Sequence, residues 1–279
     1  MSVKFFGQYL IERGEIDAGQ LRESLELMAA ENRTLGEIAI QQAFLSQAGA
    51  TEVNELQRTD DRHFGELAVN LGLLTSEELG RALRIQRETH LLLGQALIRL
   101  EHVATERLGA LLDEFKIDQA PFELGANPLP EEVRGNRLAH AVLDLLPKIC
   151  IRVARITGKL GAAEDLSLAP ELAYSATVTA SGPSGLSITL FADREFCEAI
   201  TVATCGIEAG DLDDEVIPDG LAEFLNVVAG NACGVLERDG IRSEVAPPIV
   251  GEPPTSGFGF PMAVTVGELY VVLTPERPE

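Results

Sequence analysis

Four glycines in the first half of the chain are separated by one interval. Gly7, Gly36, Gly65 and Gly94 follow one another at steps of 29 residues. An apolar residue precedes each glycine, and another follows four residues after it. Repeats with periods of roughly 20–50 residues are typical of stacked supersecondary units. The first half is therefore predicted to be an array of four similar units.

Each unit has the pattern of a helix, a turn and a second helix. In the third unit, Phe64, Leu67 and Leu71 recur at helical spacing, and Gly72 suits the end of a helix. The segment 75–78, Thr-Ser-Glu-Glu, matches a capping box, in which a hydroxyl and a glutamate satisfy free backbone N–H groups. The second and fourth units are poorer copies of this pattern. These features predict an all-α repeat domain.

The repeat resembles the MshEN module, the cyclic di-GMP-binding domain at the N-terminus of type II secretion ATPases. Its motifs begin with Arg-Leu-Gly and end with Gln. Here the Leu-Gly core recurs at 35–36 and 93–94, and the closing Gln recurs at Gln57 and Gln86. The positions that this resemblance assigns to nucleotide binding are Arg33, Gly36, Gln57, Arg62, Gly65 and Gln86.

The first motif position departs from that family. An arginine there suits the guanine and phosphate groups of the ligand. The corresponding residues here are Phe5, Thr34, His63 and Leu92. Arg33 and Arg62 stand one residue earlier. The alternative is a helical interaction module that binds no nucleotide.

A proline-rich segment follows the repeats. Residues 119–133 contain Pro121, Pro128 and Pro130, and proline disfavours helix in itself and in the residue before it. The predicted organisation is a repeat domain over 1–118, a linker over 119–133 and a second domain over 134–279.

The second domain mixes helices with strand pairs. The segment 174–180 is rich in strand formers, 181–185 is a turn, and 186–191 alternates as a partner strand. Helices are expected over about 138–153, 193–204 and 218–236, and further strands near 242–250, 258–266 and 269–273. This order predicts an α+β layer fold, a sheet with covering helices.

The helix expected from Pro218 is almost wholly apolar or small, with few polar exceptions. At 3.6 residues per turn, Asp219, Glu223, Asn226 and Gly230 fall within an arc of about 60°. One narrow stripe therefore presents carboxylates and a carboxamide, beside a glycine where another molecule could approach closely. On its own, such a stripe also fits the solvated face of a helix.

This stripe resembles the signature of the CheC/CheX/FliY chemotaxis phosphatases. Their motif, Asp/Ser-x-x-x-Glu-x-x-Asn on one helix with a later proline, reads here as Asp219, Glu223 and Asn226. Pro247 and Pro248 stand near the expected proline. The chain has one copy of the motif, which is similar to the CheX branch.

The resemblance implies a chemistry. CheX-like proteins hydrolyse the aspartyl phosphate of CheY-like response regulators, which supply the phosphoryl group and their own Mg²⁺. Glu223 would pair with a lysine of the regulator, Asn226 would orient the attacking water, and Asp219 and Gly230 would support the motif. No metal or other cofactor is expected on this chain. Relatives dimerise through their sheets, so a homodimer is expected by resemblance.

The net charge, the apolar runs and the cysteines restrict the kinds of partner and the compartment that are expected for this chain. A formal net charge of −22 repels nucleic acid and anionic membranes. No apolar run is long enough for a membrane span, and Cys150, Cys197, Cys205 and Cys233 form no paired motif, so a cytoplasmic protein is expected. The alternative to an enzyme is a non-enzymatic signalling adaptor that binds a response regulator, cyclic di-GMP or both.

Overall fold

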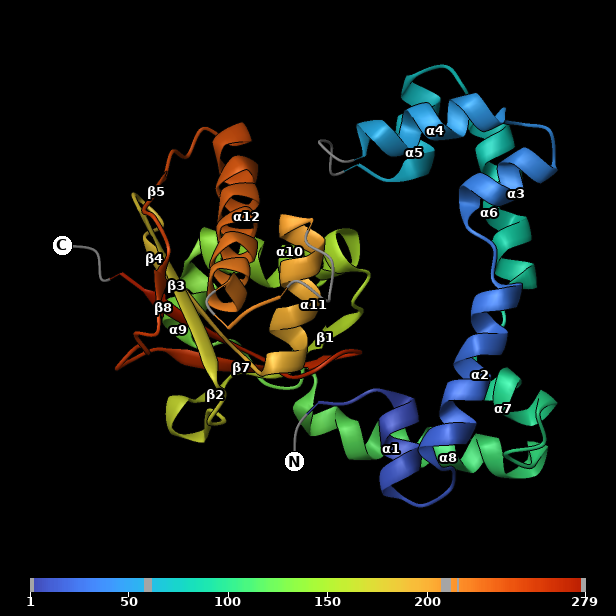
Figure 1. Cartoon of the computed structure of the whole chain (residues 1–279), viewed down its shortest axis with the longest axis horizontal. Helices are drawn as coiled ribbons and strands as arrows, with labels where there is room; N and C mark the ends of the chain where they lie inside the picture. The colour runs from blue at the N-terminus through green and yellow to red at the C-terminus, as the bar shows by residue number, and fades with distance from the viewer. Residues whose placement is uncertain (1–2, 58–61, 207–211, 215, 277–279) are drawn as a thin grey trace. The chain divides into compact units, whose positions relative to one another are not determined.

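The chain divides into two compact units (Figure 1). The structure, a computed structural model, describes residues 3–57, 62–206, 212–214 and 216–276, apart from the side chain of Cys205. One unit spans Phe6–Asp113, and the other joins the N-terminal segment up to Phe5 with the chain from Glu114 onward. The division falls inside a helix, α8 (Thr105–Gln119). The linker at 119–133 stays a prediction; that segment contains η1 (Ala120–Phe122) and most of α9 (Glu131–Gly135).

The first unit is helical, as predicted. Each repeat contributes a seven-residue helix and then a longer one. The helices before α8 are α1 (Phe6–Glu12), α2 (Ala18–Glu31), α3 (Leu35–Gln41), α4 (Gln47–Leu56), α5 (Phe64–Asn70), α6 (Ser76–Thr89) and α7 (Leu93–Arg99). The capping box of Thr75 and Glu78 forms as expected.

The repeats pack in two pairs. Helix α2 contacts α7, while α3 contacts α6 and α4 contacts α5, so the first repeat pairs with the fourth and the second with the third. Gly7, Gly36 and Gly65 lie in these contacts, and Gly94 lies against Leu108 of its own repeat. A Cβ on Gly36 would stand 3.1 Å from the ring of Phe64, and one on Gly7 would stand 3.4 Å from Leu93. The constant interval of the glycines therefore reflects close helix packing.

Each repeat also turns between its two helices through a left-handed residue. These residues are Gly14 (φ 70°), Ala43 (φ 56°), Gly72 (φ 70°) and Glu101 (φ 59°), again at steps of 29. A residue with a Cβ pays about 1–2 kcal/mol in this conformation, which glycine adopts freely. The two poorer copies of the repeat are therefore strained at this turn.

Glu101→Gly is expected to stabilise the helical unit by about 0.5–1 kcal/mol, because the relief of strain exceeds the extra entropy of glycine in the unfolded chain. The reverse change, Gly72→Ala, should cost a similar amount. Denaturant unfolding of the two variants beside the wild type measures both. Equal stability for all three proteins would contradict the strain at the turn inside the repeat.

The second unit is an antiparallel sheet covered by helices, which confirms the α+β prediction. Its eight strands follow the order β1-β7-β8-β4-β3-β5, with β2 also on β7 and β6 also on β3. The strands are β1 (Gly158–Leu160), β2 (Glu164–Asp165), β3 (Tyr174–Ser181), β4 (Leu186–Ala192), β5 (Glu244–Val245), β6 (Ile249–Val250), β7 (Phe258–Val264) and β8 (Leu269–Pro275). The covering helices are α10 (Arg137–Ala154), α11 (Arg194–Cys205) and α12 (Val216–Arg238).

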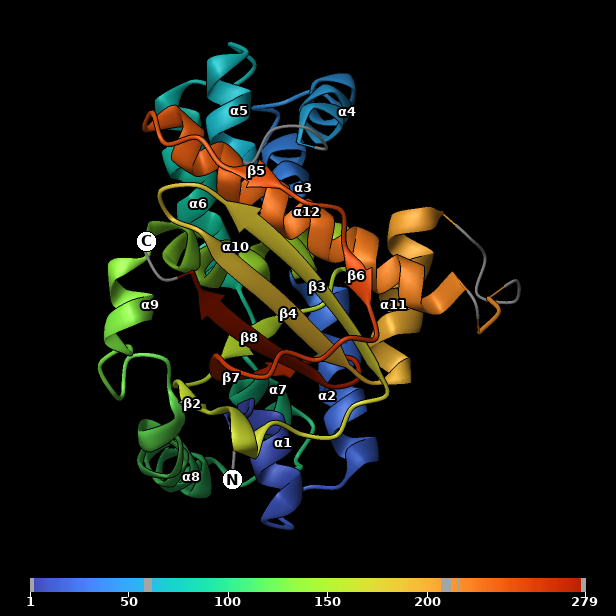
Figure 2. The same cartoon turned by 90° about the vertical axis from the view of Figure 1, so that its left-hand side faces the viewer.

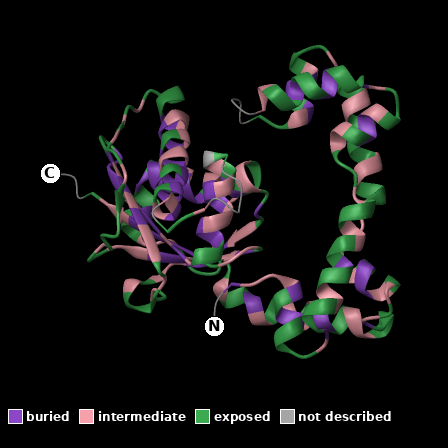
Figure 3. Ribbon diagram, in the orientation of Figure 1, coloured by how far each residue is buried: buried purple, intermediate pink, exposed green. Residues whose placement is uncertain are grey.

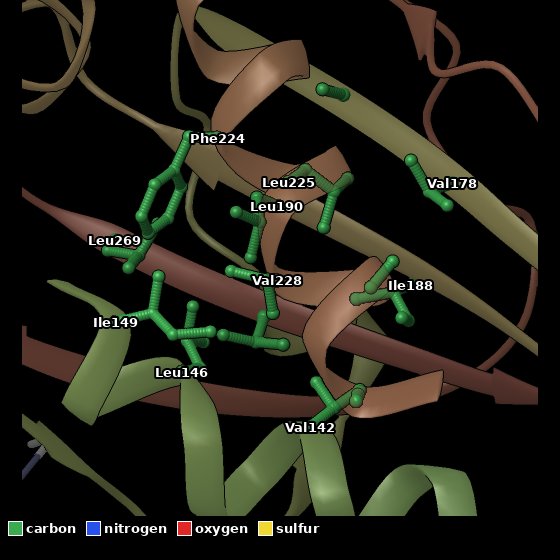
Figure 4. Packing of buried hydrophobic residues seen from close by; sticks show 14 of the residues in the cluster. Val142, Leu146, Ile149, Val178, Ile188, Leu190, Phe224, Leu225, Val228 and Leu269 are labelled. Carbon is green, nitrogen blue, oxygen red and sulfur yellow. The ribbon is translucent and has the colours of Figure 1, made fainter. Parts of the chain in front are cut away.

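The two faces of the sheet differ in chemistry. Alternate residues of β3 and β4, such as Val178 and Ile188, are buried against α10 and α12 (Figures 3 and 4). The other face carries hydroxyls, and Thr177 and Thr189 form a hydrogen bond of 2.8 Å across the two strands. Figure 2 views this second face, which the connection from β6 to β7 crosses. Within the part of the chain that the structure describes, α10 and α12 cover the apolar face of the sheet.

Two details of the second unit differ from the sequence prediction. The strand expected over 242–250 is split into β5 and β6, because Pro247 and Pro248 between them cannot donate to the ladder. Strands β1 and β2 were not predicted, since they are only three and two residues long. The acidic loop expected over 207–217 lies mostly outside the described residues.

Candidate functional site

The long helix α12 is fixed firmly on its inner side. Its start is capped by Asp213, whose carboxylate accepts a hydrogen bond of 3.0 Å from the N–H of Val216. Its apolar face is buried against the sheet, α10 and α11, and Phe224 meets Phe196 edge-on at 6.2 Å between ring centroids. Such packing holds the outer face of the helix in a defined position.

One glycine sets how closely α12 approaches α11. A Cβ on Gly220 would stand 2.8 Å from the Cα of Thr201, which leaves no room for a methyl group. The hydroxyl of Thr201 is itself fixed, because it donates to the carbonyl of Cys197 at 2.7 Å. Gly220 lies inside the Asp-x-x-x-Glu motif, so the motif also carries a packing requirement that the sequence did not reveal.

The outer face of α12 presents the predicted stripe. Asp219, Glu223 and Gly230 are exposed, and Asn226 is half-buried. No atom outside the helix backbone lies within 4 Å of a Cβ placed on Gly230. The structure therefore brings the four residues to one open surface of a single helix.

The two central side chains of the stripe are available to a partner. Within the described part of the chain, Glu223 and Asn226 make no hydrogen bond and no ion pair. The next amide on the helix behaves differently, since Asn231 donates to the carbonyl of Val227 at 2.7 Å. Asn226 is therefore an unengaged carboxamide on a rigid support, able both to donate and to accept.

The two prolines of the predicted signature lie beside this helix. Pro247 and Pro248 join β5 to β6, and both strands contact α12. The segment that follows the helix thus returns along it and forms, as β5 and β6, the edge of the sheet beside β3. Its prolines also keep this edge from pairing with a further strand.

The residues assigned to nucleotide binding are engaged within the helical unit. Gln57 donates to the carbonyl of Arg62 at 3.2 Å, and Gln86 donates to the carbonyl of Arg33 at 3.4 Å. The two glutamines thus make matching contacts between the second and third repeats. Gly36 and Gly65 serve helix packing, the latter against Leu79 and Leu35.

The three cysteines whose side chains the structure describes add no reactive group to the site. Burial raises the pKa of the Cys150 thiol and of the Cys197 thiol to about 12, and it also raises the pKa of Cys233. A thiol with such a pKa is a poor nucleophile at neutral pH. Among the residues that the structure describes, no three His, Cys, Asp or Glu side chains gather as a metal site. Within the same residues, no helix is long and apolar enough to span a bilayer.

Comparisons with known proteins bear on this helix directly. Residues 174–256 match the family described as chemotaxis phosphatase CheX. The match runs from β3 to the segment after β6 and so contains all of α12. A search of curated proteins finds no relative that matches this chain.

Three solved structures are similar to the second half of the chain. A chemotaxis protein CheX from Desulfovibrio desulfuricans has 21% identity and a TM-score of 0.41, over 50% of this chain and 99% of its own. The complex of CheX with CheY, beryllofluoride and Mg²⁺ from Borrelia burgdorferi has 19% identity and a TM-score of 0.40, over 50% and 97%. FliY from Thermotoga maritima has 17% identity and a TM-score of 0.35, over 52% and 90%.

The family match covers β3, β4, α11, α12, β5 and β6, and it therefore contains the whole stripe. The C-terminal half of the chain therefore contains a CheX-like domain.

Proposed function

We propose that the CheX-like unit hydrolyses the aspartyl phosphate of a CheY-like response regulator. The observation that carries this proposal is the pair formed by Glu223 and Asn226. The two side chains have no partner among the described residues, and they project from a helix whose other face is buried. They lie within the segment that matches the CheX family.

Each residue of the pair suits one task. The carboxylate of Glu223 would pair with a lysine of the regulator and fix the docked orientation. The carboxamide of Asn226 would hold a water in line with the phosphorus, since it can accept from the water and donate to the phosphoryl oxygens. The water attacks phosphorus, the bond to the aspartyl oxygen breaks, and the products are inorganic phosphate and a free carboxylate. The Mg²⁺ ion belongs to the regulator.

The other parts of the stripe would support docking. Asp219 lies in the first turn of α12, where a carboxylate is favoured by the helix dipole. Gly230 leaves space at the far end of the stripe, so the backbone of the regulator could approach the helix there. We also expect a homodimer, from the family resemblance alone.

The test is phosphate release from a panel of phosphorylated CheY-like regulators. Addition of the wild-type protein is expected to speed loss of phosphate from the cognate regulator by at least about tenfold. Glu237→Ala, a change on the same helix but far along from the stripe, should leave that rate unchanged. A wild-type protein that accelerates no regulator in the panel would argue against the enzyme and for an adaptor that only binds.

A second function is proposed for the helical unit, the binding of cyclic di-GMP. Gln57 and Gln86 donate to the backbone carbonyls of Arg62 and Arg33, so each closing glutamine contacts the residue that precedes a first motif position. Each of these arginines would offer one guanidinium group to a phosphate of the ligand. Calorimetric titration with cyclic di-GMP tests this, and heats that do not change in Arg33→Ala/Arg62→Ala would oppose it.

A further inference from the structure

A groove lies along one flank of α10, and none of the stripe residues lines it. Its volume is about 400 Å³, and side chains of α10, of β1 and of the segment before α9 surround it. Its apolar lining includes Leu124, Leu129, Leu143 and Leu160. The side of α10 that carries Val142, Leu146 and Ile149 faces the core (Figure 4), so the groove lies on a neighbouring side of the helix. A mostly apolar groove of this volume is typical of small-molecule sites.

A proline inside α10 lines this groove. Pro147 has no N–H, so it cannot donate to the carbonyl of Leu143 four residues earlier. Each carbonyl of an α-helix points along the axis toward the residue four positions later, so the Leu143 carbonyl is directed at Pro147. Both residues line the groove. The groove therefore contains a backbone acceptor that the helix leaves without its usual donor.

Little water reaches this acceptor. Leu143 is buried, with 5% of its surface exposed. Among the residues that the structure describes, no side chain and no N–H from a loop donates to its carbonyl. Buried carbonyls in folded proteins are nearly always paired. A bound molecule with a hydrogen-bond donor would supply the missing bond.

The rim of the groove is polar, and its charges are paired with each other. Both carboxylate oxygens of Asp144 accept hydrogen bonds from the ammonium group of Lys148, at 2.8 and 2.7 Å. His140 lies one turn before Asp144, and its Nε2 donates to the carbonyl of Arg134 at 2.9 Å. A cationic ligand would compete with Lys148 for Asp144, and an anionic ligand would meet the carboxylate itself. The rim therefore favours a neutral ligand.

We propose that this groove binds a small, neutral aromatic molecule with one N–H group, such as an indole, and that the N–H donates to the carbonyl of Leu143. The leucines would cover the ring, which is the usual division of tasks in a site with an apolar body and one polar contact. The site is separate from the phosphatase proposed above. Because α10 packs on α12, the bound molecule would contact the helix that supports the stripe.

The experiment is an NMR titration of the full chain with two matched probes, indole and benzofuran. The two molecules have nearly the same shape, but benzofuran has an oxygen in place of the N–H. Indole is expected to shift the amide signals of residues 140–147 and of Leu160. Its Kd should be about fivefold lower than that of benzofuran, which is the usual net effect of one hydrogen bond.

Pro147→Ala makes the test specific to the carbonyl. Alanine at this position supplies the missing N–H, so the Leu143 carbonyl gains a donor within the helix while the leucines stay in place. Indole should then bind this variant no better than benzofuran does. The matched control is Pro218→Ala in the first turn of α12, where a helix needs no N–H, and it should keep the preference of the wild type.

Two kinds of result would overturn the inference. If indole shifts none of these signals at about 10 mM, the Kd that a low ligand efficiency implies for a molecule of this size, the groove is not a binding site. If indole and benzofuran bind the wild type equally, or if Pro147→Ala keeps the preference for indole, the Leu143 carbonyl is not the acceptor.

Discussion

Gly220→Ala is expected to destabilise the CheX-like unit by about 3 kcal/mol, the upper end of the usual cost of overpacking a core. The added methyl group would meet the backbone of Thr201, not only its side chain, so it cannot be accommodated by a change of rotamer. Thr201 is buried and bonded to the carbonyl of Cys197, which keeps α11 from shifting locally. Thermal unfolding of the full chain, with hydrogen exchange followed in α11 and α12, measures the effect.

Gly230→Ala is the matched control for that experiment. The two glycines lie on the same helix, but nothing outside the helix backbone stands within 4 Å of a Cβ at Gly230. Alanine is favoured over glycine in a helix interior by roughly 1 kcal/mol, so this variant should be as stable as the wild type or more so. If both variants lost stability equally, the close contact between α11 and α12 would be contradicted.

Glu223→Lys is expected to weaken binding of the cognate activated regulator about 100-fold, because it replaces an attractive charge pair by a repulsive one. Because Glu223 is exposed, its replacement by lysine should not disturb folding. Thermal unfolding of the Glu223→Lys variant should therefore match that of the wild type. Glu237→Lys makes the same charge change on the same helix, about 21 Å further along its axis, and should bind normally.

A second measurement makes that prediction specific. Reversal of the active-site lysine of the regulator to glutamate should restore part of the binding to Glu223→Lys, since the pair then has opposite charges again. If only the lysine-to-glutamate regulator regains binding to Glu223→Lys, the contact between Glu223 and that lysine is identified. Failure of every regulator variant to recover binding would mean that Glu223 does not face the lysine.

The helical half shows what a repeat in the sequence can reveal. The period of 29 predicted helix pairs and the positions of their caps, because these depend on residues close together in the chain. It did not predict that the first repeat packs with the fourth, since that contact joins α2 to α7 across the rest of the unit. The glycines were visible in the sequence, but their neighbours, such as Phe64 against Gly36, were not.

The stripe was predicted for a similar reason. Asp219, Glu223, Asn226 and Gly230 belong to one helix, so their spacing alone places them on one face. The packing of Gly220 against Thr201 escaped prediction because it involves another helix, and the contact of Arg152 with Asn231 escaped it for the same reason. Arg152 and Asn231 are 79 residues apart in the chain, and only the packing of α10 on α12 brings them together.

The most direct test of the account is the rate of phosphate release by Asn226→Ala at a saturating concentration of the cognate regulator. Removal of one positioned group that acts in the transition state should lower kcat by about 10²–10³-fold, while Kd for the beryllofluoride-activated regulator stays near that of the wild type. That result would identify Asn226 as the residue that orients the water. Phosphate release at the wild-type rate by a folded Asn226→Ala protein would contradict the central claim.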